Sequence, residues 1–548
     1  MMKKIIEYTL GSMLAFGVLA SCTGKFEEFN TSDITVDPNT LPLSAQCLEP
    51  MAYCYPPHQN MFQFWGNLSL DFYCGYFMTP NGNFTNGDLG KNRGHSGGMH
   101  ENFYLHIFNN TRRIIAANEA AKPGVAAVMK IVQSLGAEMT TDTYGPIAYS
   151  SILSGENEVV YHFDSQQKIY ETILADLKDV ISTLEKVSDA DKQDIANFDI
   201  WCGGDVNLWI KVANTMRLRI ALKLSKRESE MKAAGFNLPE IAKEAAANTL
   251  ANGGKDIVVT GQSNELKRMF EWGDTAPNAF IITLMDGYND PRLPLYFTKN
   301  AEVKQGDKVL VEANKGYYGI RIGSGLPGKP NPWGSFSQWT GSYNTPLPIF
   351  KQAESYFLLA EAAVRGWISG DAKSYYEDGI KTSIKNEIAH NIAVPADLIE
   401  AAKKADVNAY INGTSHQKDF KDPVDDQNSI KATVQVPVKW ESDKEKQLEQ
   451  IMTQKFIAVF PLSYVTWSDS RRTGYPRLFP ARINESQGAV KTEEGVRRQV
   501  YSDNEGSTNL EALNAGIEIL MKENSSTWSK GDTGGTRVWW DVEGKSNF

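Results

Sequence analysis

Residues 354–380 read ESYFLLAEAAVRGWISGDAKSYYEDGI, and this stretch is the most informative one about the fold. Apolar residues at helical spacing cover 346–366 and 371–389, on either side of a short turn that contains Gly366 and Gly370. Small residues recur where the two helices must approach closely. Because one helix pair cannot bury its apolar face alone, we expect further helix pairs around it.

Other segments show the same helical spacing, at 103–120, 124–140, 164–187 (with Asp164 as its N-cap), 205–225, 237–251, 441–461 and near 508–522. The segment 253–345 is irregular, with short β-like runs such as Ile257–Val259, and 462–548 is mostly loop. The pair at 354–380 is similar to a tetratricopeptide helix pair, although no clean period of roughly 34 residues runs along the chain. We predict a mainly α fold, in which a tetratricopeptide-like scaffold of helix pairs carries loop-rich excursions.

Composition and charge exclude several classes of protein. The chain has 548 residues, of which 22% are charged and 41% hydrophobic, as in an ordinary globular protein. Its net charge of −10 argues against a nucleic-acid-binding protein, whose binding surface is usually basic. The same charge argues against broad electrostatic docking on an anionic membrane, but it does not exclude a lipid anchor.

The first residues predict export and lipid attachment. Lys3 and Lys4 precede an apolar run from Leu10 to Ala20, which is too short to span a bilayer and fits a signal peptide. The run ends in Leu19–Cys22 (LASC), which resembles the lipobox of bacterial lipoproteins. We therefore expect a signal peptide at 1–21 and acylation of Cys22, with a lipid-anchored tether at 22–45 and a single binding domain at 46–548. The residues just after Cys22, a lysine followed by two glutamates, resemble the surface-export signal of some bacterial lipoproteins.

Four further cysteines lie in the expected domain: Cys47, Cys54, Cys74 and Cys202. Export permits disulfides, but the spacings match no zinc ribbon or CxxC motif. The sequence chooses neither among the three possible pairings nor between disulfides and buried free thiols.

An oligosaccharide site needs flat aromatic rings, on which the C–H faces of sugars stack, with polar side chains beside them. Two segments have this composition, 61–104 and 331–343, and Glu271–Asp274 would add a third wall. We expect ligand contacts at Trp333, Trp339, Tyr343, Phe336, Trp272, Trp65 and Tyr76. The alternative for each single ring is core packing beneath its loop, as we expect for Trp201, Trp209, Trp367 and Trp467 and for the structural plug Trp539–Trp540.

No catalytic motif is recognisable: the sequence has no Walker A motif, no GxSxG and no HExxH. His95, His100 and His106 are five and six residues apart, which does not place them on one helix face, so we expect neither a metal nor a cofactor. Arg471 and Arg472, with Arg477 and Arg482, form a basic cluster. We interpret it as ion pairing to acidic helices, with a site for a phosphate or an acidic sugar as the alternative.

A series of motifs along nearly the whole chain resembles the SusD/RagB family of nutrient-binding lipoproteins. In chain order they are FEEFN (26–30), TDTYGPIAY (141–149), DPRLP (290–294), the 354–365 helix, QKFIA (454–458), RRTGYP (471–476), RQVY (498–501) and VWWD (538–541). Each motif alone is weak, whereas their common order is specific. The departures are small: Ala148 replaces a usual Pro, and Arg497–Arg498 stand where the family often has Pro-x-Arg.

The resemblance implies an α-helical binding protein with four tetratricopeptide-like pairs. It also implies a lipid-anchored protein of the outer membrane, exposed to the cell exterior, which hands its ligand to a SusC-like, TonB-dependent transporter. The ligand would be an oligosaccharide or, as an alternative, a peptide, and the protein would not be an enzyme. Two other classes remain open at this point, a tetratricopeptide-like scaffold that binds only protein and a surface glycoside hydrolase.

Overall fold

The computed structural model describes residues 40–548 except 92, 154–160, 391–392 and 525–528. The expected signal peptide, Cys22 and most of the expected tether therefore lie outside the described residues. Among the described residues, the first α-helix is α3 (Leu43–Ala52), which begins just before the expected end of the tether at residue 45.

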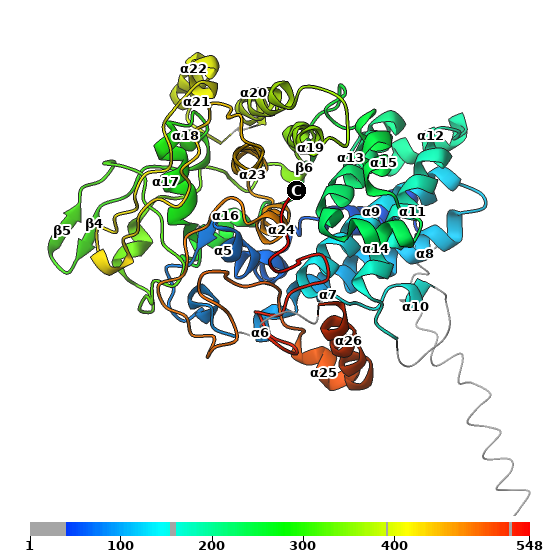
Figure 1. Cartoon of the computed structure of the whole chain (residues 1–548), viewed down its shortest axis with the longest axis horizontal. Helices are drawn as coiled ribbons and strands as arrows, with labels where there is room; N and C mark the ends of the chain where they lie inside the picture. Colours follow the sequence, from blue (N-terminus) through cyan, green and yellow to red (C-terminus); the bar gives the residue numbers. More distant parts are fainter. Residues whose placement is uncertain (1–39, 92, 154–160, 391–392, 525–528) are drawn as a thin grey trace, which may run out of the picture.

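Paired helices form one half of the molecule, on the right of Figure 1. They are α8 (Asn109–Asn118), α9 (Pro123–Tyr144), α11 (Gln166–Leu184), α12 (Asp189–Phe198), α13 (Val206–Lys223), α14 (Glu228–Ala233) and α15 (Leu238–Ala246). Here α9 packs against α8 and α11, and α13 packs against α11 and α15. The mainly α fold predicted from the sequence is confirmed.

The helix pair predicted from residues 354–380 is α19 (Gln352–Val364) and α20 (Ala372–His390), which pack against each other. Gly379 of α20 lies against the ring of Phe357, where an added Cβ would approach three ring atoms to 2.9–3.0 Å. The two helices can therefore approach this closely because residue 379 has no side chain. Next to them, α23 (Lys444–Ala458) packs against α19, and α24 (Ser463–Thr473) packs against α23 and α5 (Leu70–Cys74).

The other half carries the loops and the short strands, at the left of Figure 1. In the described part of the chain, three two-stranded antiparallel sheets pair β1 (Phe77–Met78) with β3 (Ala276–Pro277), β2 (Ile257–Val259) with β6 (Leu347–Phe350), and β4 (Val303–Gln305) with β5 (Lys308–Val311). Short helices lie between them, α4 (Gln59–Phe62), the π-helix η2 (Gln63–Asn67), α16 (Leu266–Glu271), α17 (Ala279–Tyr288) and α18 (Leu293–Tyr296). Among the described residues, no helix is both long and apolar enough to cross a bilayer.

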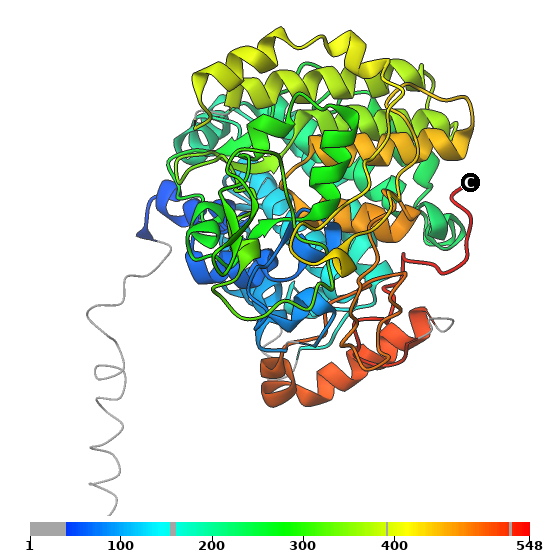
Figure 2. The same cartoon turned by 90° about the vertical axis from the view of Figure 1, so that its left-hand side faces the viewer.

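Two further groups of helices lie at opposite ends of the molecule. Figures 1 and 2 show α21 (Ala396–Lys404) and α22 (Val407–Ile411) above the scaffold, beside α20, and α25 (Asp503–Thr508) and α26 (Leu510–Glu523) below it. The segment 462–548 is thus mostly loop with a helix near 508–522, as predicted, except that its first residues form α24.

Three local predictions are corrected. The helix expected from residue 346 begins only at Gln352, because 347–350 pair with β2 as a strand. The segment 253–345 contains the ten-residue helix α17, whose apolar residues are almost all buried. The N-cap of α11 is Ser165 rather than Asp164, because the Asp164 carboxylate instead accepts hydrogen bonds from the backbone of Tyr149 and Ser150.

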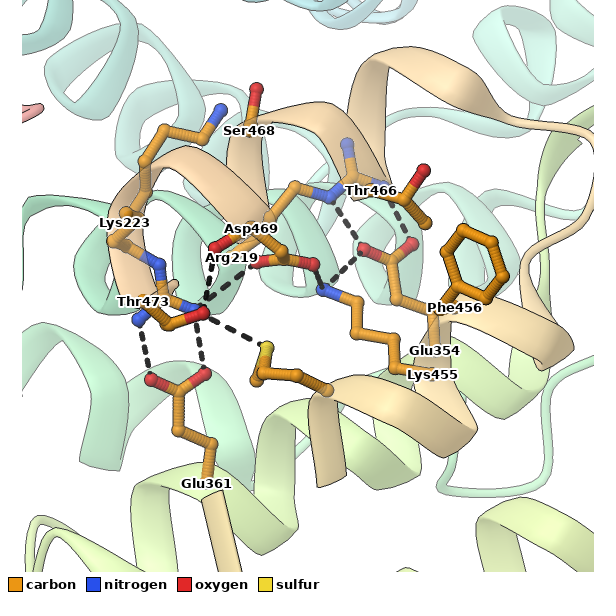
Figure 3. Close-up of polar contacts among 12 residues, drawn as sticks. Arg219, Lys223, Glu354, Glu361, Lys455, Phe456, Thr466, Ser468, Asp469 and Thr473 are labelled. Atoms are coloured by element: carbon orange, nitrogen blue, oxygen red, sulfur yellow. Dashed lines mark hydrogen bonds and ion pairs between the residues drawn. The ribbon is translucent and has the colours of Figure 1, made fainter. Parts of the chain in front are cut away.

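A network of ion pairs runs through the helical scaffold (Figure 3). Arg219 of α13 donates two hydrogen bonds to Glu354 of α19, at 2.9 and 2.7 Å. Lys455 of α23 lies 3.3 Å from Glu354 and 2.8 Å from Asp469 of α24. Arg472 of α24 donates to both carboxylate oxygens of Glu361, at 2.6 and 2.9 Å. Four helices are joined in this way by side chains that water hardly reaches.

Asp142 near the end of α9 is a second centre of buried polar contacts. Its carboxylate accepts hydrogen bonds from the indole of Trp540 at 2.9 Å, the hydroxyl of Ser468 at 3.0 Å, and from Lys223 and Tyr170. Trp539 and Trp540 are 3% and 0% exposed, which confirms that the pair is a structural plug. The four cysteines of the domain are buried free thiols.

Candidate ligand-binding surface

The aromatic segment 331–343 does not form one presented surface. Trp333 is 8% exposed and Phe336 is fully buried, and both belong to a small apolar cluster that also contains Phe72, Met78 and Ile320. The indole of Trp333 donates a hydrogen bond to Asp422 Oδ2 at 2.8 Å. These two rings therefore fix the loop to the body of the protein. The expectation of ligand contact at Phe336 is corrected because its ring is buried, and only a small part of Trp333 remains accessible.

Two further predicted rings lie in the main core. Trp65 is 3% exposed and packs against Tyr55 and Phe62. Tyr76 is 0% exposed, its ring packs at a tilt against that of Phe456, and its hydroxyl donates a hydrogen bond to the carbonyl of that residue. Neither ring has a face left for a ligand, so the expectation of ligand contact at Trp65 and Tyr76 is corrected.

Trp339 lines a small pocket of about 50 Å³ and is itself 8% exposed. Tyr296 and Phe460 share the pocket with an ion pair in which Lys351 Nζ lies 2.7 Å from Glu387 Oε1. This pocket is too small for a sugar ring, so Trp339 could reach a ligand only through its exposed edge.

Trp272 and Tyr343 are the predicted rings that reach solvent, and both lie beside α16. Trp272, the C-cap residue of that helix, is 37% exposed. Tyr343 is half-buried, and the guanidinium carbon of Arg268 lies 5.1 Å from the centroid of its ring. The hydroxyl of Tyr343 donates a hydrogen bond to Glu271 at 2.5 Å. Ligand contact at these two residues stays a prediction.

A polar network lies directly behind Trp272. Asp274 accepts hydrogen bonds from Lys329 at 2.6 Å and from Asn81 and Gln63 at 3.3 Å each. The ammonium of Lys329 also donates to the backbone carbonyl of Trp272 at 2.6 Å. One buried carboxylate thus ties α16 to the loops 79–84 and 325–331 and to the π-helix η2.

Backbone contacts fix the two loops against each other. The amide of Gly82 donates to the carbonyl of Pro327 at 3.1 Å, and Asn331 donates through its side chain to the carbonyl of Pro80 at 2.5 Å. An added Cβ at Gly82 would lie 1.7 Å from the carbonyl oxygen of Leu326, so only glycine permits this approach. The surface is therefore built in advance of any ligand.

A second aromatic group comes from segments of the chain that also contribute to this network, and the sequence did not single out its member Phe64. Phe64, which follows Gln63, stacks on the imidazole of His95 with ring centroids 5.0 Å apart, and Phe84 contacts that imidazole edge-on at 5.7 Å. All three rings are partly exposed. The glycine- and asparagine-rich composition of 81–98 indicated an ordered loop with polar groups. It did not show that the rings of Phe64 and His95 would contact each other.

We call the following residues the candidate ligand-binding surface: the group Trp272, Tyr343 and Arg268, the group Phe64, Phe84 and His95, and the polar residues Gln63, Asn81, Asp274 and Lys329. The described residues include no group of three or more His, Cys, Asp or Glu side chains placed to bind a metal. Chemically, the surface offers aromatic rings for stacking, with amide and charged groups beside them.

A larger pocket, of about 440 Å³, lies elsewhere, between α5, the end of α24 and the segments 476–481 and 492–497. Arg471, at its rim, belongs to the basic cluster seen in the sequence. The ion-pairing interpretation of that cluster is confirmed for Arg472, which pairs with Glu361, and for Arg477, which pairs with Glu449 at 3.2 Å. Arg471 and Arg482 instead donate to backbone carbonyl and side-chain amide or hydroxyl oxygens.

Comparison with known proteins identifies the family. A family model described as Susd and RagB outer membrane lipoprotein matches residues 27–541. A solved chitin-binding SusD homologue from Flavobacterium johnsoniae is 28% identical, with a TM-score of 0.78 over 92% of this chain and 100% of that chain. SusD homologues from Bacteroides thetaiotaomicron (27% identity, TM-score 0.77, 92% and 99% covered) and Bacteroides vulgatus (26%, 0.78, 92% and 98%) are similarly close. A search of curated proteins gives no significant match. The chain belongs to the SusD/RagB family of outer-membrane lipoproteins.

Proposed function

We propose that this protein is a non-catalytic lipoprotein of the cell surface that binds an oligosaccharide and passes it to a SusC-like, TonB-dependent transporter. Acylation of Cys22 would anchor it in the outer membrane, on the exterior side. The observation that carries the proposal is the exposed ring of Trp272 beside the network of Asp274, Asn81 and Lys329.

The chemistry of this surface suits a sugar. The ring of Trp272 provides an apolar face on which the C–H side of a sugar ring can stack. The exposed Asn83, the half-buried Tyr343 and the ammonium of Lys329 supply donors and acceptors for hydroxyl groups. The Flavobacterium johnsoniae homologue is described as chitin-binding, which supports a glycan as the class of ligand.

Calorimetric titration of residues 25–548 tests the proposal, with chitin oligosaccharides, plant and host glycans and a set of peptides as ligands. We expect binding of one glycan class and no cleavage products in the mixtures. The double variant Trp272→Ala/Tyr343→Ala should weaken binding by about tenfold or more, because each stacked ring contributes about 1 kcal/mol. Trp367→Ala is the matched control, since Trp367 is also partly exposed but lies at the turn between α19 and α20.

Each other outcome would change the proposal in a defined way. Unchanged glycan binding in the double variant would keep the function and move the site. Binding of peptides alone would replace the oligosaccharide by a peptide, and cleavage would overturn the non-catalytic assignment. The transporter partnership has a separate test, which is co-purification of the tagged lipoprotein with a TonB-dependent barrel from native outer membranes.

A further inference from the structure

Two hollows meet at the C-terminal end of α24. One is the pocket of about 440 Å³ described above, and the other is an open cleft of about 330 Å³. Lys226, the end of α24 and the segment 542–547 line the cleft. Arg471 and Arg497 border both hollows, and the cleft shares no lining residue with the candidate ligand-binding surface.

Arg471 carries a buried charge that forms no direct ion pair with any carboxylate of the described residues. The residue is 4% exposed, and its guanidinium lies between the rings of Trp467 and Trp540, 3.6 and 4.7 Å from their centroids. It donates to the backbone carbonyls of Asp142 and Arg497, at 2.8 and 2.7 Å. Burial lowers the pKa of Arg471, although Asp142 and Asp541 oppose the shift. Because an arginine nevertheless remains protonated, this positive charge acts on both hollows.

Two lysines at the cleft add to the excess of positive charge. The ammonium of Lys226 has no hydrogen-bond or ion-pair partner in the described part of the chain, and the ammonium of Lys545 donates to the backbone carbonyl of Lys226. Burial lowers the pKa of Lys226 to about 8, and the nearby Arg472, Arg497 and Arg365 lower it while Asp541 raises it. Lys226 and Lys545 thus line the same cleft, and in the described part of the chain neither ammonium has a carboxylate at ion-pair distance.

The other charges of the cleft are compensated. Arg472 pairs with Glu361 and Asp469, and Arg497 and Arg537 share Asp541. Of the two glutamates that line the cleft, Glu543 pairs with Lys491, and Glu445 accepts hydrogen bonds from Tyr475 and Asn547. Among the described residues, three cations of the cleft lack a direct ion pair, namely Lys226, Lys545 and Arg471. The carboxylates of Asp541, Glu230 and Asp142, respectively, act on them from beyond ion-pair distance.

We propose that this cleft binds a small oxyanion of the sulfate or phosphate type, held by the ammonium groups of Lys226 and Lys545 in the field of Arg471. Oxygen acceptors of such an ion would give both lysines a charged hydrogen-bond partner. The anion is either a free inorganic ion or the sulfate or phosphate ester of a larger ligand, since the cleft is open on one side. This site is independent of the glycan contact proposed at Trp272.

Calorimetry with inorganic sulfate and phosphate, at low ionic strength in a zwitterionic buffer, tests the proposal on residues 25–548. We expect saturable binding that weakens as sodium chloride is added. The double variant Lys226→Met/Lys545→Met should bind about tenfold more weakly or worse, because a hydrogen bond from a charged group is worth more than a tenfold change in affinity. The matched control Lys522→Met changes an ammonium that is 79% exposed on α26 and should bind like the unaltered protein.

A second readout reports on the site itself. NMR of ¹³C-dimethylated lysines should show the Lys226 signal titrating near pH 8 without sulfate and at higher pH when sulfate is saturating. Tighter binding of a sulfated monosaccharide than of inorganic sulfate would support an ester as the natural ligand, and the reverse would support the free ion. Absence of saturable binding, or equal affinity in the double variant, would overturn the proposal.

Discussion

Replacement of Glu354 by glutamine tests whether the buried ion network holds the scaffold together. Glu354 is 0% exposed, accepts two hydrogen bonds from Arg219 and lies 3.3 Å from Lys455. The variant Glu354→Gln keeps the size of the side chain but removes its charge, and it places an amide donor opposite a cation. Arg219 would keep only its longer contact to Glu138, at 3.4 Å.

The expected cost follows from the burial of the partners. Breaking a buried ion pair on one side costs about 3–5 kcal/mol in a poorly polarisable interior, because Arg219 and Lys455 are then left with one carboxylate each, Glu138 at 3.4 Å and Asp469 at 2.8 Å. The entropy of unfolding is about 2.1 cal/mol/K per residue, or on the order of 1 kcal/mol/K for a chain of 548 residues. We therefore expect Glu354→Gln to lower the Tm by about 3–5 °C in differential scanning calorimetry.

The control is an exposed pair of the same type. Glu400 and Lys403 lie 2.8 Å apart, but their side chains are 55% and 52% exposed, so Glu400→Gln should change stability by less than about 1 kcal/mol. Equal Tm shifts in the two variants would refute the reasoning, because the network would then contribute no more than a surface pair.

The pH dependence of this effect has a defined sign. Burial alone would raise the pKa of Glu354, but Arg219 and Lys455 hold it below the ordinary value of 4.5. Its stabilising contribution is thus fully present above pH 4.5 and is lost as the pH falls through the lower pKa of the folded state. The Tm difference between the unaltered protein and Glu354→Gln should narrow correspondingly in acid.

Three other predictions concern packing and titration. Gly379→Ala should lower the Tm because its Cβ would meet the ring of Phe357 at 2.9 Å, whereas Gly506→Ala, with its nearest neighbour 3.9 Å away, should not; equal shifts would contradict the close helix approach. Burial raises the pKa of Asp71 to about 7, so the folded protein keeps a proton that the unfolded chain releases near pH 4, and its stability falls as the pH rises from 4 to 7. The Tm of Asp71→Asn relative to the unaltered protein should therefore increase over this range, and a constant difference would argue against the shift. Burial raises the pKa of Cys47 to about 12, and all four domain cysteines are buried, so Ellman's reagent should modify them only after unfolding; rapid modification of the native protein would contradict this.

The sequence predicted the helical scaffold well because local spacing decides it. The helix expected at 124–140 is α9, Pro123–Tyr144, and the pair expected from 354–380 is α19 and α20. Prediction failed where a distant partner decides the structure. Residues 347–350 form a strand because β2, about ninety residues earlier, pairs with them, and the sequence around 347 shows no sign of that partner.

The candidate site was predicted less well for the same reason. Whether an aromatic residue in a loop faces water depends on contacts across the whole chain: Trp333 is fixed by Asp422 and Tyr76 by Phe456. The network behind Trp272 joins Asp274 to Asn81, 193 positions earlier. Composition pointed to loops that contribute to the candidate ligand-binding surface, but it could not distinguish the rings that reach solvent from those that anchor the loops.

The motifs that carried the family resemblance explain why the fold could be inferred more firmly than the ligand. Asp142, from the 141–149 motif, accepts the indole hydrogen bond of Trp540, from the 538–541 motif. Arg472, from the 471–476 motif, pairs with Glu361, from the 354–365 helix. These residues are buried and join helices far apart in the chain, so the motifs describe the polar framework of the scaffold. Trp272, Tyr343 and Lys329 lie outside every one of them, and a change of ligand could therefore arise on this surface without altering the residues that identify the family.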